Sequence, residues 1–175
     1  VIEIASNDGY LLQYFNEKKI PNFGIEPTRA TALAAKKKGV HTLQKFFNKK
    51  FAKELIEKDG FANGGVDLLI ANNVAAHVPE INNFISAISL ILKKNGVASI
   101  EFPHLLKLLE GNQFDTIYHE HFSYFSLGTF SKILEKNGLN IIEVEELSTH
   151  GGSLRVWASN NKDHVKNINV SKLIK

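Results

Sequence analysis

Short apolar runs with strand character alternate along this chain with helix-length segments, and this alternation constrains the fold more than any other feature. Strands are expected at residues 1–5, 22–26, 40–43, 66–71, 97–102, 140–145 and 153–158. Helices are expected at residues 9–19, 30–38, 49–58, 81–94 and 129–137. Alternating strands and helices are typical of parallel sheets with helices on both faces. We therefore predict a doubly wound α/β fold with a seven-stranded sheet.

Glycines and capping residues mark where several of these elements begin and end. Thr28 is a candidate N-cap, and Gly39 stands just past the end of the same helix. A glycine-rich turn at 60–65 precedes the run V-D-L-L-I-A at 66–71. Because this run is apolar on both faces, we expect its strand to lie in the middle of the sheet.

Composition narrows the class of protein. The chain has 175 residues, 43% of them apolar, which suits one globular domain with a substantial core. It has no cysteine, so disulfides and thiolate zinc sites are excluded within it, and a cytoplasmic setting is expected. The net charge of +3 comes from scattered lysine clusters typical of solvated helix faces, so no nucleic-acid partner is expected. No apolar run approaches the roughly 20 residues that span a bilayer, so no membrane partner is expected.

The two ends of the chain suggest that it is part of a longer protein. Val1 already lies inside a strand-type run, and there is no initiator methionine. We expect missing sequence before this strand. We assign residues 1–159 to the core and residues 160–175 to a polar tail that leads toward a further domain.

The turn after the first strand, E-I-A-S-N-D-G, is a candidate cofactor site. In a doubly wound sheet this turn lies at the carboxyl edge, where ligands bind. A dinucleotide fold, such as that of an NAD-dependent dehydrogenase, would carry a fuller G-x-G-x-x-G there, but only one glycine is present. Acceptor side chains suit the ammonium of a methionine moiety better than a phosphate. The candidate cofactor residues in this turn are Glu3, Asn7, Asp8 and Gly9.

Three further positions are candidates for the same crevice. Glu26 ends the second strand about twenty residues on, where an acidic side chain can accept hydrogen bonds from both ribose hydroxyls; the alternative is an ordinary exposed glutamate. Asn72 and Asn73 close the buried fourth strand and are expected to bind the cofactor, although helix capping would also explain them. The pair at 46–47 could stack on adenine, but core packing is the favoured role for these phenylalanines.

The most informative segment is Q-F-D-T-I-Y-H-E-H-F-S-Y-F-S at 113–126, which follows E-F-P-H at 101–104. Ionisable and phenolic groups are concentrated there in a loop at the edge where substrates bind, among aromatic residues that exclude water. Such surroundings are typical of acid–base catalysis.

These segments together resemble the sugar C-methyltransferases that build the branched deoxysugars of antibiotics. The resemblance rests on E-I-A-S-N-D-G-Y-L-L, G-I-E-P-T, N-N-V-A-A-H-V-P, E-F-P-H, F-D-T-I-Y-H-E-H-F-S-Y-F-S and H-G-G-S-L-R-V. It implies a Rossmann-like class I S-adenosylmethionine-dependent methyltransferase whose last strand inserts antiparallel. It also implies methyl transfer to carbon 3 of a nucleotide-linked 4-keto deoxysugar. The ketone acidifies the hydrogen on that carbon, so a base can form an enolate.

The resemblance also assigns roles to individual residues. His121 is the expected base, and Glu120 and Tyr118 are expected to position it or the sugar. Substrate contacts are expected from Asn73, His77 and His104. No metal is expected, since methyl transfer from a sulfonium needs no Lewis acid and the H-x-H pair at 119–121 lacks an obvious third ligand.

Some alternatives remain open from the sequence. An O- or N-methyltransferase of another small metabolite would use the same cofactor turn without abstracting a carbon-bound proton. A non-catalytic binding domain would retain the fold alone. The H-G-G-S-L-R-V block could be a structural turn into a strand, or its Arg155 could hold a phosphate. Members of the resembled family carry a cysteine-ligated zinc module before this core and a further domain after it; neither lies in this sequence.

Overall fold

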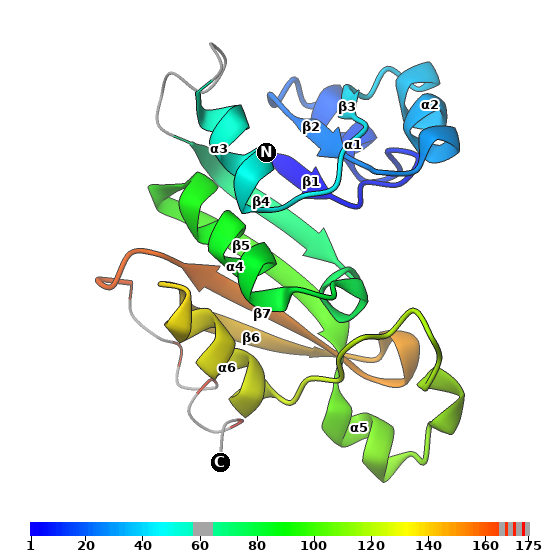
Figure 1. Ribbon diagram of the computed structural model, residues 1–175, viewed down its shortest axis with the longest axis vertical. Coiled ribbons are helices and arrows are strands. Elements are labelled where there is room, and N and C mark those ends of the chain that lie inside the picture. The colour runs from blue at the N-terminus through cyan, green and yellow to red at the C-terminus, as the bar shows by residue number, and fades with distance from the viewer. Residues whose placement is uncertain (58–64, 165–166, 168–169, 171–172, 174–175) are drawn as a thin grey trace.

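The computed structural model describes residues 1–57, 65–164, 167, 170 and 173, which form one seven-stranded sheet flanked by helices (Figure 1). The strands are β1 (Ile2–Ile4), β2 (Phe23–Ile25), β3 (Thr42–Leu43), β4 (Val66–Asn72), β5 (Leu92–Pro103), β6 (Asn140–Leu147) and β7 (Ser153–Ser159). The helices are α1 (Leu12–Glu17), α2 (Arg29–Lys37), α3 (Lys49–Ile56), α4 (Ile81–Ile91), α5 (Leu105–Glu110) and α6 (Leu127–Lys136). Single turns of 3-10 helix occur at Ala75–His77, Phe114–Thr116 and Thr149–Gly151.

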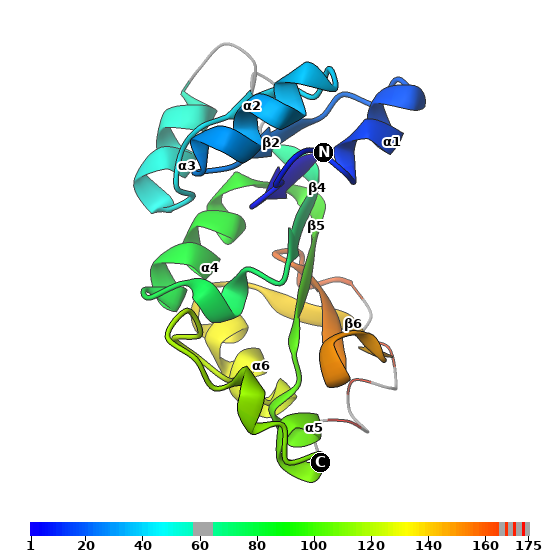
Figure 2. The same cartoon turned by 90° about the vertical axis from the view of Figure 1, so that its right-hand side faces the viewer.

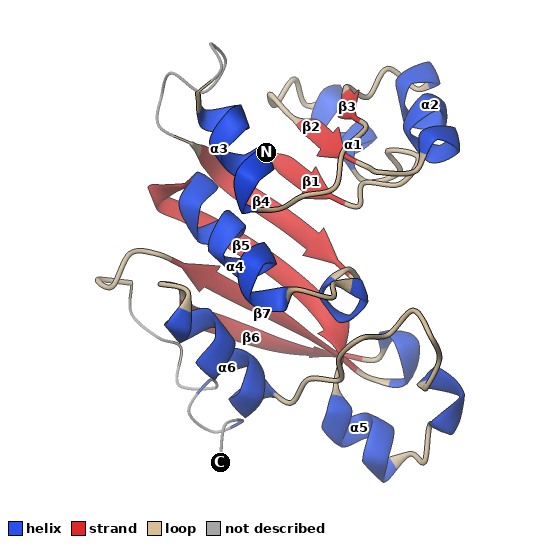
Figure 3. Ribbon diagram, in the orientation of Figure 1, coloured by secondary structure: helices blue, strands red, loops and turns tan. Residues whose placement is uncertain are grey.

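The strand order is β3-β2-β1-β4-β5-β7-β6, and β7 runs antiparallel to both of its neighbours (Figure 3). The remaining pairs, from β3 across to β5, are parallel. This topology confirms the predicted doubly wound seven-stranded sheet and the antiparallel strand that the resemblance implied. The strand order reverses between β1 and β4, so the carboxyl ends of these two strands border the crevice where ligands bind in such sheets.

The main core lies on the face of the sheet that α3, α4 and α6 cover, and Figure 2 shows α4 and α6 together on one side of the strands. Its strand side chains alternate with those of the opposite face, as in Leu69 and Ala71 of β4, which are fully buried. A smaller cluster of Leu12, Ala35 and Val40 packs α1 and α2 together. Strand β4, which contains the run at 66–71, is the fourth of the seven strands across the sheet, so the prediction of a central strand is confirmed.

Two helices differ from their predicted bounds by three residues at one end, and glycines lie near both of these ends. The helix expected at 9–19 begins only at Leu12, since Gly9 has a φ of +77°, which a helix cannot accommodate. The helix expected at 81–94 ends at Ile91, where the chain passes directly into β5. A Cβ on Gly65 would collide with the carbonyl oxygen of Ile91, so the missing side chain allows this tight junction.

Other features of the fold were not predicted or lie outside the described residues. Helix α5 had no predicted counterpart. The end of the helix expected at 49–58 and most of the glycine-rich turn at 60–65 lie outside the described residues. Within the proposed tail, Val170 is buried and belongs to the main core, while the division at residue 159 stays a prediction. None of the helices in the described part of the chain has the length and apolar character needed to cross a membrane.

Candidate active site

The turn after β1 is a tight, irregular bend rather than an open glycine loop. Ala5, Asn7 and Gly9 all have positive φ values, between 53° and 77°. A Cβ on Gly9 would lie 2.9 Å from a methyl group of Val40, so this glycine is required by the packing of the turn as well as by its φ. Asn7 is exposed, and its backbone N–H points at the end of β2.

Glu26 ties this turn to the end of β2. One carboxylate oxygen accepts a hydrogen bond from the Asn7 N–H at 3.0 Å, and the other accepts one from the Thr28 N–H at 2.7 Å. The side chain is buried, yet it borders a cavity at this edge of the sheet. Because each carboxylate oxygen has a second lone pair, Glu26 can still accept hydrogen bonds from a ligand's hydroxyl groups.

Asp8 does not border this cavity. Its carboxylate forms an ion pair of 2.5 Å with Lys38 at the end of α2. This hydrogen bond lowers the pKa of the Asp8 carboxyl. Asp8 is therefore placed at the partly exposed edge between the turn and α2, and it does not line the cavity.

Glu3 and Asn72 lie behind the turn, on the sheet face opposite the main core. Burial raises the pKa of Glu3 to about 8, and one of its carboxyl oxygens has no hydrogen-bond partner. The side-chain oxygen of Asn72 is likewise buried without a partner. Burial, followed by the charges of Glu3 and Glu101, also raises the pKa of the neighbouring Tyr10 phenol. Neither Glu3 nor Asn72 lines a cavity.

The larger of the two cavities described here, about 690 Å³, opens beneath the ends of β1, β2 and β4. Its walls include Glu26, Asn73 and Phe46. The Phe46 ring is 76% exposed, whereas Phe47 packs edge-on against Phe84 in the core at a centroid distance of 5.8 Å. Core packing was the favoured role for both phenylalanines; the structure gives it to Phe47 and leaves Phe46 on the cavity wall.

The segment 113–126 forms the predicted aromatic loop, and His121 is held firmly within it. Its Nδ1 lies 2.8 Å from the carbonyl oxygen of Thr116. Its Nε2 lies 3.1 Å from the Tyr118 hydroxyl, and the Tyr118 and Tyr124 rings pack against the imidazole. Because a carbonyl oxygen can only accept, Nδ1 carries the proton, and the neutral ring presents an unprotonated Nε2.

His77 brings the end of β4 into contact with this loop. The His77 and His121 rings are 4.8 Å apart, and His77 Nδ1 lies 3.1 Å from the backbone carbonyl oxygen of Glu120. The Glu120 side chain itself is exposed and lines neither cavity. The structure therefore gives Glu120 a contact through its backbone.

A second cavity of about 240 Å³ surrounds His121, and it joins the two halves of the site. Its lining includes Tyr118, Asn73 and His77, and the last two also line the large cavity. Asn73 has a left-handed φ of 53°, and its side-chain oxygen is buried without a partner. Predicted cofactor and substrate residues thus meet at Asn73 and His77.

The structure also places a further predicted residue, His104, outside both cavities and adds residues that were not predicted. His104 is buried beside Phe125 and lines neither cavity, and burial lowers the pKa of its imidazole. Asp115 and His150 line the small cavity, although the sequence did not single them out. In the described part of the chain, no three acidic or histidine side chains are placed to hold a metal ion.

Comparison with known proteins agrees with this architecture. Residues 1–144 match the family model described as "Methyltransferase domain". The chain is 36% identical over 159 residues to the C-methyltransferase NovU of Streptomyces niveus, which covers 91% of this chain and 37% of that protein. The chain therefore spans little more than a third of this curated relative.

Solved structures share the fold at low sequence identity. A magnesium protoporphyrin IX methyltransferase from Synechocystis PCC 6803, with bound SAH, superposes with a TM-score of 0.66 at 16% identity, over 90% of this chain and 72% of that chain. An S-adenosylmethionine-dependent methyltransferase from Clostridium acetobutylicum gives a TM-score of 0.68 at 11% identity, over 91% and 83% of the two chains. The chain thus belongs to the methyltransferase-domain family, and it has the class I, Rossmann-like fold of the S-adenosylmethionine-dependent methyltransferases on which it superposes.

Proposed function

We propose that this domain methylates carbon 3 of a nucleotide-linked 4-keto deoxysugar and that His121 is the base. The observation that carries the proposal is the 2.8 Å contact between His121 Nδ1 and the Thr116 carbonyl oxygen, which makes Nε2 the unprotonated nitrogen of the neutral ring. This Nε2 faces the Tyr118 hydroxyl in a cavity that shares two wall residues with the large crevice, and a substrate hydrogen would replace the hydroxyl as its partner. The 36% identical relative from Streptomyces niveus is a C-methyltransferase, which supports methylation at carbon.

The residues of the large cavity fit S-adenosylmethionine. Glu26 offers carboxylate oxygens for ribose hydroxyls, the exposed Phe46 ring offers a flat surface for adenine, and Asn73 offers an acceptor without a partner. When bound, S-adenosylmethionine supplies an electrophilic methyl group, whose bond to sulfur breaks as the nucleophilic carbon takes it. Ala5, in the first turn, and Ile4 before it contribute to the wall of the same cavity.

The chain's own contribution to the chemistry is removal of one proton. The ketone at carbon 4 acidifies the hydrogen on carbon 3, and His121 Nε2 takes that proton while the electron pair moves into the enolate. The Tyr118 hydroxyl, 3.1 Å from Nε2, marks the direction in which this lone pair points. The imidazolium then returns the proton to solvent. A positioned base of this kind contributes about 10²- to 10⁴-fold to the rate.

Hydrogen exchange tests the proposal in the full-length protein. A nucleoside-diphosphate-linked 4-keto-2,6-dideoxyhexose is incubated in D₂O with S-adenosylhomocysteine, and deuterium at carbon 3 is followed by NMR. We expect wash-in with the wild type and a loss of about 100-fold or more in His121→Asn, with unchanged S-adenosylhomocysteine affinity. His119→Asn, an exposed neighbour outside both cavities, is the matched control and should exchange normally.

Two results would contradict the proposal. Methyl transfer to the sugar without exchange at carbon 3 would favour an O- or N-methyltransferase. Parallel loss of exchange and cofactor affinity in His121→Asn would make this histidine structural.

A further inference from the structure

The turn Thr149–Gly151 presents His150 to the small cavity in a strained conformation. His150 has φ 52° and ψ 37°, in the left-handed region that non-glycine residues rarely adopt. The two glycines that follow it also have positive φ, and each is closely packed: a Cβ on Gly151 would lie 2.6 Å from the Gln113 side chain, and one on Gly152 would lie 2.8 Å from Lys107. The sequence H-G-G at 150–152 thus forms a closely packed turn that places the His150 imidazole on the wall of the small cavity.

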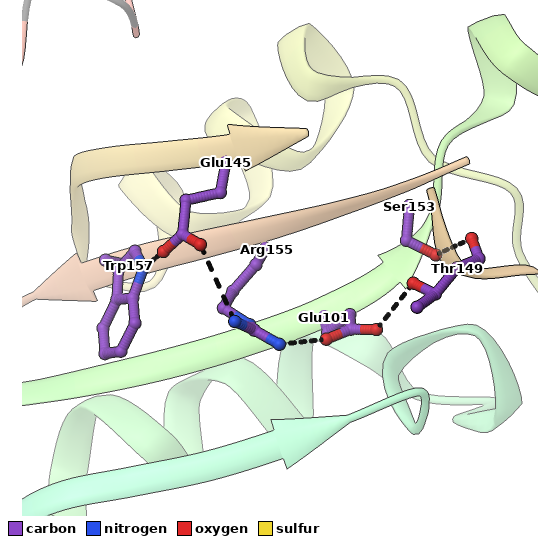
Figure 4. Close-up of polar contacts among 6 residues, drawn as sticks. All are labelled: Glu101, Glu145, Thr149, Ser153, Arg155 and Trp157. Carbon is purple, nitrogen blue, oxygen red and sulfur yellow. Dashed lines mark hydrogen bonds and ion pairs between the residues drawn. The ribbon is translucent and has the colours of Figure 1, made fainter. Parts of the chain in front are cut away.

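A polar network anchors this turn to the sheet (Figure 4). Buried Glu101 of β5 accepts a hydrogen bond from the Thr149 hydroxyl at 3.3 Å and pairs with Arg155 of β7 at 2.8 Å. The backbone carbonyl of the same Glu101 accepts the N–H of Asn73 at 2.8 Å. One residue therefore fixes both the His150 turn and the Asn73 turn, which border the same small cavity.

The hydrogen bonds of the cavity decide which groups can donate to a ligand. His77 and His121 each give their Nδ1–H to a backbone carbonyl oxygen, so in the neutral state each presents only an acceptor at Nε2. The Tyr118 hydroxyl faces Nε2 of His121. Among the described residues, no hydrogen bond to a protein atom fixes the tautomer of His150. His150 and the amide of Asn73 are therefore the available nitrogen donors of the cavity wall.

We propose that His150 is a further catalytic residue, which donates an imidazole N–H to the substrate's carbonyl oxygen as negative charge develops on it. This inference rests on the proposed function, because an enolate forms only if a carbon-bound proton is removed. The electron pair released by that deprotonation moves onto the oxygen, and the hydrogen bond from His150 stabilises the charge there. Donors placed in this way typically contribute about 10²- to 10³-fold.

The test is again deuterium wash-in at carbon 3, in the full-length protein with S-adenosylhomocysteine and the same 4-keto-2,6-dideoxyhexose nucleotide. We expect His150→Ala to slow exchange about 100-fold or more, with unchanged S-adenosylhomocysteine affinity by calorimetry. His150→Gln keeps an N–H donor and should retain exchange to within about 10-fold of the wild type. His41→Ala, at an exposed position outside both cavities, controls for loss of a histidine.

The outcomes are separable. Wild-type exchange with an equally active His150→Ala variant would overturn this inference and leave the proposed function standing. Loss of cofactor affinity together with exchange in both His150 variants would also overturn it, because the turn would then be structural. Absence of exchange in the wild type itself would instead refute the proposed function, and this inference with it.

Discussion

The buried carboxyl of Glu3 should make the stability of this domain fall as pH rises. Burial raises its folded pKa to about 8 from the usual 4.5, so folding favours the protonated form. A carboxyl group whose pKa is higher in the folded state stabilises the fold fully at pH values below its unfolded-state pKa. This stabilisation is lost as the pH rises through the folded-state pKa. Between those values stability falls by about 1.4 kcal/mol per pH unit, or about 5 kcal/mol across the window.

The perturbation that tests this reasoning is Glu3→Gln, which keeps the shape of the protonated acid and cannot ionise. Guanidinium unfolding is followed at pH 5, 6, 7 and 8 through Trp157, the single tryptophan of the chain. The variant's stability advantage over the wild type should be about 2–3 kcal/mol larger at pH 7 than at pH 5. Glu17→Gln, on the exposed side of α1, is the control. Parallel pH profiles for wild type and Glu3→Gln would refute the reasoning.

Two further predictions concern the large cavity. Glu26→Gln should weaken S-adenosylhomocysteine binding about 10- to 100-fold. Asp8→Asn should change this affinity less than about 3-fold, because Asp8 pairs with Lys38 outside the cavity. Calorimetry of both variants tests the assignment, and equal losses of affinity would contradict it. Phe46→Ala should weaken the same binding about 10-fold, whereas Phe46→Tyr should preserve it, and an unchanged affinity in Phe46→Ala would exclude stacking on adenine.

The number of strands and the rough positions of most elements could be predicted from the sequence, because apolar periodicity and glycine positions report local structure directly. The spacing of Glu26 after the first turn places it at the crevice, and its backbone partners are consistent with that expectation. Likewise, resemblance identified a compact cluster around His121 that the structure brings together with His77. These predictions depend on short-range pattern or on motifs that span the site.

What the sequence could not predict depends on contacts between distant elements. Asp8 in the first turn pairs with Lys38 at the end of α2, and an acidic residue in the turn does not by itself predict this long-range ion pair. Whether Phe46 or Phe47 enters the core depends on how the chain turns after β3. His150 was overlooked because its signal, a histidine before two glycines, has an ordinary structural explanation until the cavity is seen.

The antiparallel direction of β7 determines at which edge of the sheet the loop between β6 and β7 lies. Because β7 enters the sheet backwards, the hairpin from β6 turns at the level where β5 ends, and Ser153 at the start of β7 sits opposite Pro103 at the end of β5. A forward strand in that slot would begin at the far rim and carry its preceding connection there. The inverted strand thus places the loop at 148–152 at the same rim as the carboxyl ends of the parallel strands, where His150 borders the small cavity and not the large one.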